Sequence, residues 1–227
     1  MNRVALVTGG SRGIGRTIAT TLAQKGHPVA LTYLTHEREA REATAVIAQA
    51  GGRATAVRLV AEDRATIRRA LDEVRQELGP IAILVNNAAI AQEKPFPEIT
   101  DDDWDRMFAV NVRGPFSCAQ EVLPDMLQQR WGRIVNISSV GGQWGGVLQV
   151  HYACAKAALN NLTRSLAKLY SRQGVTTNTV AGYPNSASIG AASWFDAYPS
   201  SKVTTTDRRG RVPSRVRRSA SANVRPT

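Results

Sequence analysis

The chain has 227 residues, of which 43% are hydrophobic, and it carries a formal net charge of +11. This length and composition predict one globular domain with a sizeable core and exclude a disordered chain. No apolar run approaches the roughly 20 residues that cross a bilayer, and the N-terminus lacks a signal-peptide layout. The two cysteines, Cys118 and Cys154, form neither a disulfide framework nor a metal-ligand spacing. We therefore expect a cytoplasmic protein with no membrane contact and no metal site.

The positive charge is concentrated near the end of the chain. Residues 1–182 hold 21 Lys and Arg against 16 Asp and Glu, a net of +5, whereas residues 183–227 hold 8 against 2, a net of +6. A basic segment can bind nucleic acid or another acidic partner. No aromatic side chains interleave its central arginines, so a solvated tail is favoured and nucleic-acid binding is a remote alternative, which would use Arg208, Arg209, Arg211, Arg215, Arg217 and Arg218.

A strand pattern, a glycine-rich turn and a helix pattern open the chain. Residues 4–8 form a short apolar run, and apolar residues at helical spacing follow the turn at 9–15. Glycines let the backbone approach a dinucleotide pyrophosphate, which rests on the helix N-terminus. The spacing differs from the commoner Gly-x-Gly-x-x-Gly, and a plain glycine turn is the alternative. The candidate cofactor-binding residues of this turn are Gly9, Ser11, Arg12, Gly13, Ile14 and Gly15.

The second predicted strand, residues 29–33, indicates which dinucleotide would bind. Enzymes that use NAD place Asp or Glu at the end of this strand, on the ribose 2′-hydroxyl. No acidic residue ends it here. Arg12 lies instead within the glycine turn, where its guanidinium could pair with a 2′-phosphate. The sequence therefore favours NADP, and a merely solvated Arg12 is the alternative.

The next predicted elements are a helix at 37–49, a strand at 54–59, a helix that ends at Gly79 and a buried strand at 81–85. Asn86, Asn87, Ala88 and Ala89 follow that strand. Asparagines at the carboxyl end of a strand can tie neighbouring loops together and contact a cofactor. Taken by themselves, the two asparagines more often mark a simple turn; Asn87 and Ala88 are the candidate cofactor-binding residues of this segment.

A helix with an unusual interior is predicted after Thr100, which precedes three aspartates and suits an N-cap. Pro115 has no N–H, so it cannot bond the carbonyl of Asn111 four residues earlier. We expect a bend at Asn111 with a free carbonyl that binds water. The alternative is a kinked helix with no functional water site. Pro124 predicts a second bend.

A fifth strand at 132–137 delivers Ser138 and Ser139, followed by a glycine-rich loop that we expect to be mobile. A long helix at 152–172 and a sixth strand at 175–180 come next. Six strands that alternate with helices predict an α/β fold, a Rossmann-type doubly wound parallel sheet. Every polar group singled out lies at a carboxyl end of a strand or on the following helix, where such sheets bind ligands.

Tyr152 and Lys156 are four residues apart, so they share one face of the predicted helix. A lysine ammonium favours the phenolate, and we expect it to lower the pKa of Tyr152, which suits a proton donor. Ser139 could hold the same carbonyl oxygen as the tyrosine. Taken alone, a Tyr-x-x-x-Lys pair more often decorates a solvated helix face.

Together these motifs resemble the short-chain dehydrogenase/reductase family, and among its members the 3-oxoacyl-acyl-carrier-protein reductases. The resemblance covers residues 3–182, and its motifs appear in the order of that family: Thr8-Gly9-x-x-x-Gly13-x-Gly15, Asn86-Asn87-Ala88, Asn111, Ser139 and Tyr152-x-x-x-Lys156. Departures are Val60 in place of Asp or Asn, Ala82 in place of Asp and Ala89 in place of Gly.

The resemblance implies a role for each matching residue. Tyr152 would protonate a ketone oxygen as hydride arrives from NADP, while Ser139 holds that oxygen. Lys156 would bind the nicotinamide ribose and lower the pKa of Tyr152, and Asn111 would position the water of a proton relay. The substrate would be a small-molecule or acyl-carrier-bound ketone. The resemblance also implies a homodimer or homotetramer through the helices that contain Asn111 and Tyr152.

The segment 183–227 departs from the family. It contains no leucine or methionine, and 25 of its 45 residues are Ser, Thr, Pro, Arg or Gly, a composition that does not build a core. We therefore expect a catalytic domain at 1–182 that lacks its last strand, followed by an atypical basic tail. Our hypothesis is a reading-frame shift near 181–182, which resequencing of the coding DNA would test; a disordered authentic extension is the alternative.

Two functions from this reading compete with each other. The first is an NADP-dependent reductase of a 3-oxoacyl thioester or a similar ketone. The second is a catalytically weak or inactive protein that still binds the dinucleotide but lacks the segment that closes over its site.

Overall fold

The computed structural model describes residues 2–182; the predictions that concern residues 183–227, including the missing last strand, lie outside the described residues. The described residues form one sheet of six parallel strands in the order β3-β2-β1-β4-β5-β6. The strands are β1 (Val4–Val7), β2 (Val29–Tyr33), β3 (Ala54–Arg58), β4 (Ile81–Asn86), β5 (Gly132–Ser139) and β6 (Val175–Gly182). The predicted doubly wound parallel sheet is confirmed.

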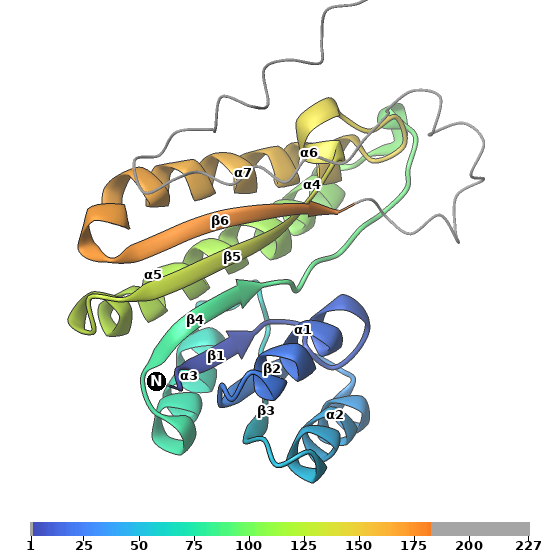
Figure 1. The fold of residues 1–227 in the computed structure, drawn as a ribbon. Coiled ribbons are helices and arrows are strands. Elements are labelled where there is room, and N and C mark those ends of the chain that lie inside the picture. The colour runs from blue at the N-terminus through green and yellow to red at the C-terminus, as the bar shows by residue number, and fades with distance from the viewer. Residues whose placement is uncertain (1, 183–227) are drawn as a thin grey trace, which may run out of the picture.

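Helices connect the strands and cover the sheet. They are α1 (Gly13–Gln24), α2 (Glu37–Gln49), α3 (Arg64–Leu78), α4 (Asp101–Phe108), α5 (Gly114–Gln128), α6 (Gly141–Trp144) and α7 (Val150–Tyr170), with short 3₁₀ turns at Phe96–Glu98 and Ser171–Gln173. Figure 1 shows α1 and α2 beside β1 and β2, whereas α5 and α7 run along β5 and β6. Within residues 2–182, no helix combines the length and apolarity that a bilayer crossing needs.

Two apolar cores lie on opposite faces of the sheet. One core joins α3 and α5 to the strands through residues such as Leu71, Val122 and Leu84. The other joins α1 and α2 to the strands through residues such as Ala19, Ile47 and Leu31. All residues of β1 and β4 are buried, as expected for central parallel strands covered on both faces. The order of the strands reverses between β1 and β4, and a crevice forms at such a point.

A chain of buried polar side chains fixes the register of the last three strands. Asn86 on β4 lies opposite Asn136 on β5, and its Nδ2 donates to the Asn136 Oδ1 at 2.8 Å. The Asn136 Nδ2 donates to the Thr163 Oγ1 on α7 at 2.8 Å, and the Thr179 Oγ1 of β6 donates to the same hydroxyl at 2.8 Å. A one-residue slip of either strand would bury these groups without partners.

The predicted irregularity near Asn111 is a π-helical turn, Ala109–Arg113, between α4 and α5. The Gly114 N–H donates to the Ala109 carbonyl, five residues back, so the turn is wider than an α-helical one. Pro115 stands in the first turn of α5, where a missing N–H costs least. Pro124 lies inside α5, which continues to Gln128. A free Asn111 carbonyl stays a prediction.

The N-terminus of α4 provides a test of local stability. Thr100 and Asp103 form a capping box: the Asp103 N–H donates to the Thr100 Oγ1 at 3.2 Å, and the Thr100 N–H donates to the Asp103 Oδ2 at 3.0 Å. Thr100→Ala is expected to lower the free energy of unfolding by about 1 kcal/mol. Chemical denaturation measures this loss.

Two matched variants make the capping experiment specific. Thr100→Ser keeps the hydroxyl and should retain most of the stability. Thr21→Ala removes an exposed hydroxyl within α1, where alanine has the higher helix propensity, so it should not lower stability. Equal losses for the two alanine variants would contradict the capping role.

Candidate active site

The glycine turn between β1 and α1 leaves no room for side chains at its key positions. Gly9 has a φ of +64°, which disfavours other residues. A Cβ added to Gly15 would lie 2.3 Å from the Gly9 carbonyl oxygen. The turn therefore closes tightly and directs the N-terminus of α1 into the crevice. Ser11 is buried, whereas Arg12 and Ile14 are exposed at the start of the helix.

The end of β4 is tied to this turn through Thr8. The Thr8 Oγ1 accepts hydrogen bonds from the backbone N–H groups of Asn87 and Ala88, both at 3.0 Å. The Asn87 Nδ2 donates to the carbonyls of Thr8 at 3.0 Å and Gly9 at 3.1 Å. The structure thus brings together Asn87, Ala88 and the glycine turn, which are about 80 residues apart in the sequence.

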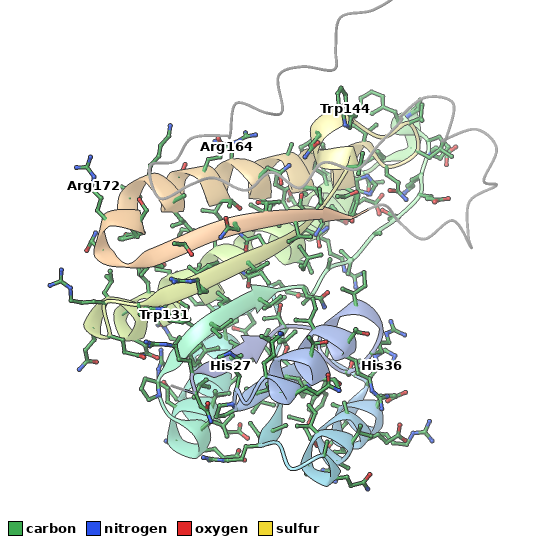
Figure 2. The ribbon with its side chains drawn as sticks, in the orientation of Figure 1. His27, His36, Trp131, Trp144, Arg164 and Arg172 are labelled. Atoms are coloured by element: carbon green, nitrogen blue, oxygen red, sulfur yellow. The ribbon has the colours of Figure 1, made fainter. Side chains whose placement is uncertain are left out.

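The end of β2 carries hydroxyl and imidazole groups. The Thr32 Oγ1 accepts from the Gly9 N–H at 3.1 Å, so β2 also supports the glycine turn. Beyond Tyr33, the Thr35 Oγ1 lies 3.1 Å from the His36 Nδ1. Figure 2 shows His36 at the start of α2, on the side of the molecule toward which the strands point.

Ser139, Tyr152 and Lys156 meet beyond the end of β5. Ser139 is buried at the last position of that strand, and its side chain lies close enough to Tyr152 to lower the pKa of the phenol. Tyr152 lies in the first turn of α7, and Lys156 lies one turn later. The Lys156 Nζ is 5.5 Å from the centroid of the tyrosine ring and donates to the Ile137 carbonyl at 2.9 Å.

The pKa of Tyr152 shifts in the direction opposite to the one predicted from the sequence. Burial raises the pKa of the phenol, and the hydrogen bond with Ser139 opposes this effect only in part. Burial also lowers the pKa of Lys156 to about 8. The predicted lowering of the tyrosine pKa was wrong for this geometry, because desolvation of the phenol outweighs any attraction to an ammonium that is directed at Ile137.

Asn111 lies in the π-helical turn beneath this group, and its side chain holds the segment after β4. Its Oδ1 accepts from the Ile90 N–H at 3.0 Å, and its Nδ2 donates to the Ile90 carbonyl at 2.8 Å. The amide therefore closes a two-bond clasp on one residue. This clasp leaves the Asn111 backbone as the part that could bind the predicted relay water.

The first part of the glycine-rich segment after Ser139 forms a turn of helix, α6, and the mobility of the segment stays a prediction. The Asn160 Nδ2 donates to the Gly142 carbonyl at 3.2 Å. A Cβ on Gly142 would lie 2.7 Å from the backbone of Lys156, so glycine allows α6 to pack directly on α7. Trp144, at the end of α6, is 60% exposed and points outward in Figure 2.

Sequence reasoning missed a second set of polar residues near Tyr152. His151 is completely buried, and its Nε2 lies 2.9 Å from the Gln92 Oε1. The Gln92 Nε2 donates to the Asp103 Oδ1 at 2.9 Å. No local pattern links Gln92 to a histidine 59 residues away, so only the fold could reveal the connection. Among the described residues, no group of His, Cys, Asp and Glu side chains could hold a metal ion.

The buried lysine predicts a pH dependence of stability. Because the pKa of Lys156 falls from 10.5 to about 8 on folding, the unfolded chain binds more protons between these pH values. The free energy of unfolding should therefore rise with pH across this window, by up to about 3 kcal/mol from this group. Lys156→Met should lose that rise.

Denaturation of the wild type and Lys156→Met at several pH values between about 7 and 10 measures the difference. Lys168→Met, an exposed position on the same helix, is the matched control and should keep the rise. If the stability of Lys156→Met changed with pH as that of the wild type does, the buried ammonium would not be its source.

Comparisons with known proteins agree with this geometry. The family model described as short chain dehydrogenase matches residues 3–196, which is 14 residues beyond the predicted boundary at 182. The chain is 37% identical over 181 residues to the 3-oxoacyl-[acyl-carrier-protein] reductase FabG of Staphylococcus aureus, covering 80% of this chain and 74% of the relative. The FabG of Aquifex aeolicus is 42% identical over 179 residues, with coverages of 79% and 72%.

A solved structure shares both the fold and much of the sequence. The blue fluorescent protein from a metagenomic library, crystallised in complex with NADPH, aligns with a TM-score of 0.75 and 38% identity. The alignment covers 79% of this chain and 73% of that protein. Together with the glycine turn and the placement of Ser139, Tyr152 and Lys156, these matches establish that the chain belongs to the short-chain dehydrogenase family.

Proposed function

We propose that the protein reduces a ketone to an alcohol with NADPH, using Tyr152 as the general acid. The observation that carries this proposal is the proximity of the Ser139 and Tyr152 side chains, which lie beside Lys156 at the carboxyl end of the sheet. Two hydroxyls directed at one point can bind a single carbonyl oxygen and stabilise the negative charge that develops on it.

The proposed mechanism assigns one task to each side chain. The Ser139 and Tyr152 hydroxyls would orient the ketone oxygen, and NADPH, when bound, would supply a hydride. Because burial raises the pKa of Tyr152, the phenol keeps its proton at neutral pH and can donate it to the developing alkoxide. The Lys156 ammonium would bind the nicotinamide ribose and stabilise the tyrosinate that remains. Water held by the Asn111 backbone would return the proton through Lys156.

The cofactor residues proposed are those of the glycine turn together with the end of β4. The N-terminus of α1 favours the pyrophosphate, since unpaired N–H groups gather there. Arg12 is exposed at the N-cap of α1 and carries no capping bond, which leaves its guanidinium available to a 2′-phosphate. The NADPH in the aligned blue fluorescent protein supports the same choice. The binding set is Gly9, Ser11, Arg12, Gly13, Ile14, Gly15, Asn87, Ala88, Tyr152 and Lys156.

The proposed substrate is a 3-oxoacyl thioester, the class named in the titles of the FabG relatives. Val147 and Leu148, exposed apolar side chains in the segment between α6 and α7, suit an acyl chain. We further propose that the protein works in the cytoplasm as a homodimer or homotetramer. A surface hollow over α4, the π-helical turn and α5 supports such an interface, with Phe108, Val112 and Phe116 in its lining.

A second candidate function rests on residues 183–227. Their composition contrasts with the rest of the chain, so we keep the proposal that the catalytic domain ends near residue 182 and that the remainder is an atypical tail. A protein without the family's closing segment would bind the dinucleotide but reduce ketones slowly. Resequencing of the coding DNA tests the frame-shift hypothesis, and an intact frame would refute it.

The central experiment measures NADPH oxidation with an acetoacetyl thioester. Tyr152→Phe is expected to lower kcat by roughly 10²-fold or more, because it removes the only proposed proton donor to the ketone oxygen. Tyr170→Phe, at the end of the same helix, is the matched control and should retain the wild-type rate. Equal rates for Tyr152→Phe and the wild type would refute the mechanism. NADPH binding without turnover in the wild type would favour the second candidate.

Arg12→Ala tests the choice of dinucleotide. Loss of an ion pair with the 2′-phosphate should weaken NADPH binding by about ten- to a hundredfold and leave NADH binding nearly unchanged. Fluorescence titration of the nicotinamide measures both affinities. Arg69→Ala, which removes an exposed guanidinium on α3, should change neither. A parallel loss of NADH and NADPH affinity in Arg12→Ala would argue against a 2′-phosphate contact.

A further inference from the structure

Residues 90–94, which we name the strap, lie in the chain between β4 and the 3₁₀ turn at Phe96–Glu98. Hydrogen bonds hold the strap between the π-helical turn and the start of α7. At one end, Ile90 is clasped by the Asn111 side chain through the two bonds described above. At the other end, the Lys94 N–H donates to the Leu148 carbonyl at 2.8 Å, two residues before α7 begins. The strap is therefore fixed to the π-helical turn and to the segment that leads into the catalytic helix.

A line of side chains runs from the strap into the first turn of α7. Asp103, in the capping box of α4, accepts from the Lys94 Nζ at 2.6 Å and from the Gln92 Nε2 at 2.9 Å. The Gln92 Oε1 then faces the His151 Nε2 at 2.9 Å. Asp103, Gln92 and His151 thus form a continuous hydrogen-bonded chain between α4 and α7.

The direction of each proton in this chain follows from Asp103. Its hydrogen bonds with Lys94, Gln92 and Thr100 lower the pKa of this carboxyl strongly, so it is ionised and can only accept. The Gln92 amide must then present its NH₂ to Asp103 and its oxygen to His151. The His151 Nε2 must carry a proton to donate to that oxygen.

The other nitrogen of His151 has no partner. Its Nδ1 is buried and makes no hydrogen bond with the described residues. A proton there would place a charge in a closed space without an acceptor. The charged groups that face this imidazole are Asp103, which favours the cation, and Lys94, which opposes it; burial has the largest effect and lowers the pKa of His151. The histidine is therefore a neutral donor of one hydrogen bond.

The position of His151 gives this bond a consequence for catalysis. Gln149, at the N-cap of α7, makes no capping bond with its side chain, so capping does not fix how the helix begins. Successive helical residues point about 100° apart. The hydrogen bond between His151 and Gln92 fixes the orientation of the first turn of α7 about the helix axis. In that orientation the side chain of Tyr152 points toward Ser139.

We propose that His151 and Gln92 are positioning residues for Tyr152, anchored by Asp103, and that they set the geometry of proton donation to the ketone. This inference rests on the proposed reductase function for its kinetic consequences. The positioning itself is a property of the folded chain and can be measured without turnover.

The kinetic test compares two substitutions at one position. His151→Phe keeps an aromatic ring but removes the donor, and it should lower kcat for ketone reduction by about ten- to a hundredfold while NADPH affinity stays within about twofold. His151→Gln places an amide NH₂ near the former Nε2 and should restore most of kcat. Gln92→Leu should reproduce the defect, and the double variant with His151→Phe should be no worse than either single variant.

A control and a second readout separate the outcomes. Gln173→Leu, an exposed position after α7, should leave kcat unchanged. Near-ultraviolet absorbance follows the ionisation of Tyr152 when the spectrum of each protein is compared with that of the same protein carrying Tyr152→Phe. In His151→Phe the phenol should turn toward solvent. The pKa of Tyr152 should then be closer to about 10 than it is in the wild type.

If the wild type reduces no ketone with NADPH, the proposed function is wrong. The ionisation of Tyr152 alone then tests whether His151 and Gln92 position this tyrosine. An unchanged ionisation in His151→Phe would overturn it. So would a loss of kcat that His151→Gln does not restore, or one matched by an equal loss of NADPH affinity, since either pattern reflects general damage to the fold.

Discussion

One hydroxyl, that of Thr8, joins the two halves of the crevice. It accepts the N–H groups of Asn87 and Ala88 at a point where β1 and β4 lie side by side and the order of the strands reverses. The glycine turn belongs to the first half of the chain, and the proposed catalytic residues belong to the second. Since hydride transfer requires both ends of one cofactor to be held at once, the geometry of the site depends on this junction.

Burial of Lys156, one of the proposed catalytic residues, lowers the stability of the fold because it disfavours the charged form of this side chain. Lys156 is buried with one carbonyl as its partner, and burial lowers its pKa to about 8. Tyr152 keeps its proton because its environment disfavours the phenolate. Such costs are common where a site must hold groups in states that water would not favour. The strap and the packing of Gly142 on α7 hold these residues in place, so rigidity comes from their neighbours.

Most of the fold could be predicted from the sequence because its signals are local. The apolar runs of the strands, the Thr100 cap and the irregular helical turn before Pro115 each depend on a few consecutive residues. The failures involve distant contacts. The sequence did not show that Gly142 lies against α7, where a Cβ would lie 2.7 Å from the backbone of Lys156. The tyrosine pKa was predicted from its spacing to Lys156, but burial determines it. The partnership of His151 with Gln92 has no local signal.

The order of the strands, with β1 and β4 adjacent at the centre of the sheet, also shows where the chain could be divided into two fragments. A break in the backbone at Gly79 would separate three strands with α1–α3 from three strands with α4–α7. Each fragment would retain most of its own helix-to-strand packing. Contact between the fragments would be restored along β1 and β4, in the apolar packing of α3 against α5, and through ion pairs such as Arg75 with Asp125. Neither fragment alone holds both the glycine turn and Tyr152, so dinucleotide binding would report the reassembly of the two pieces.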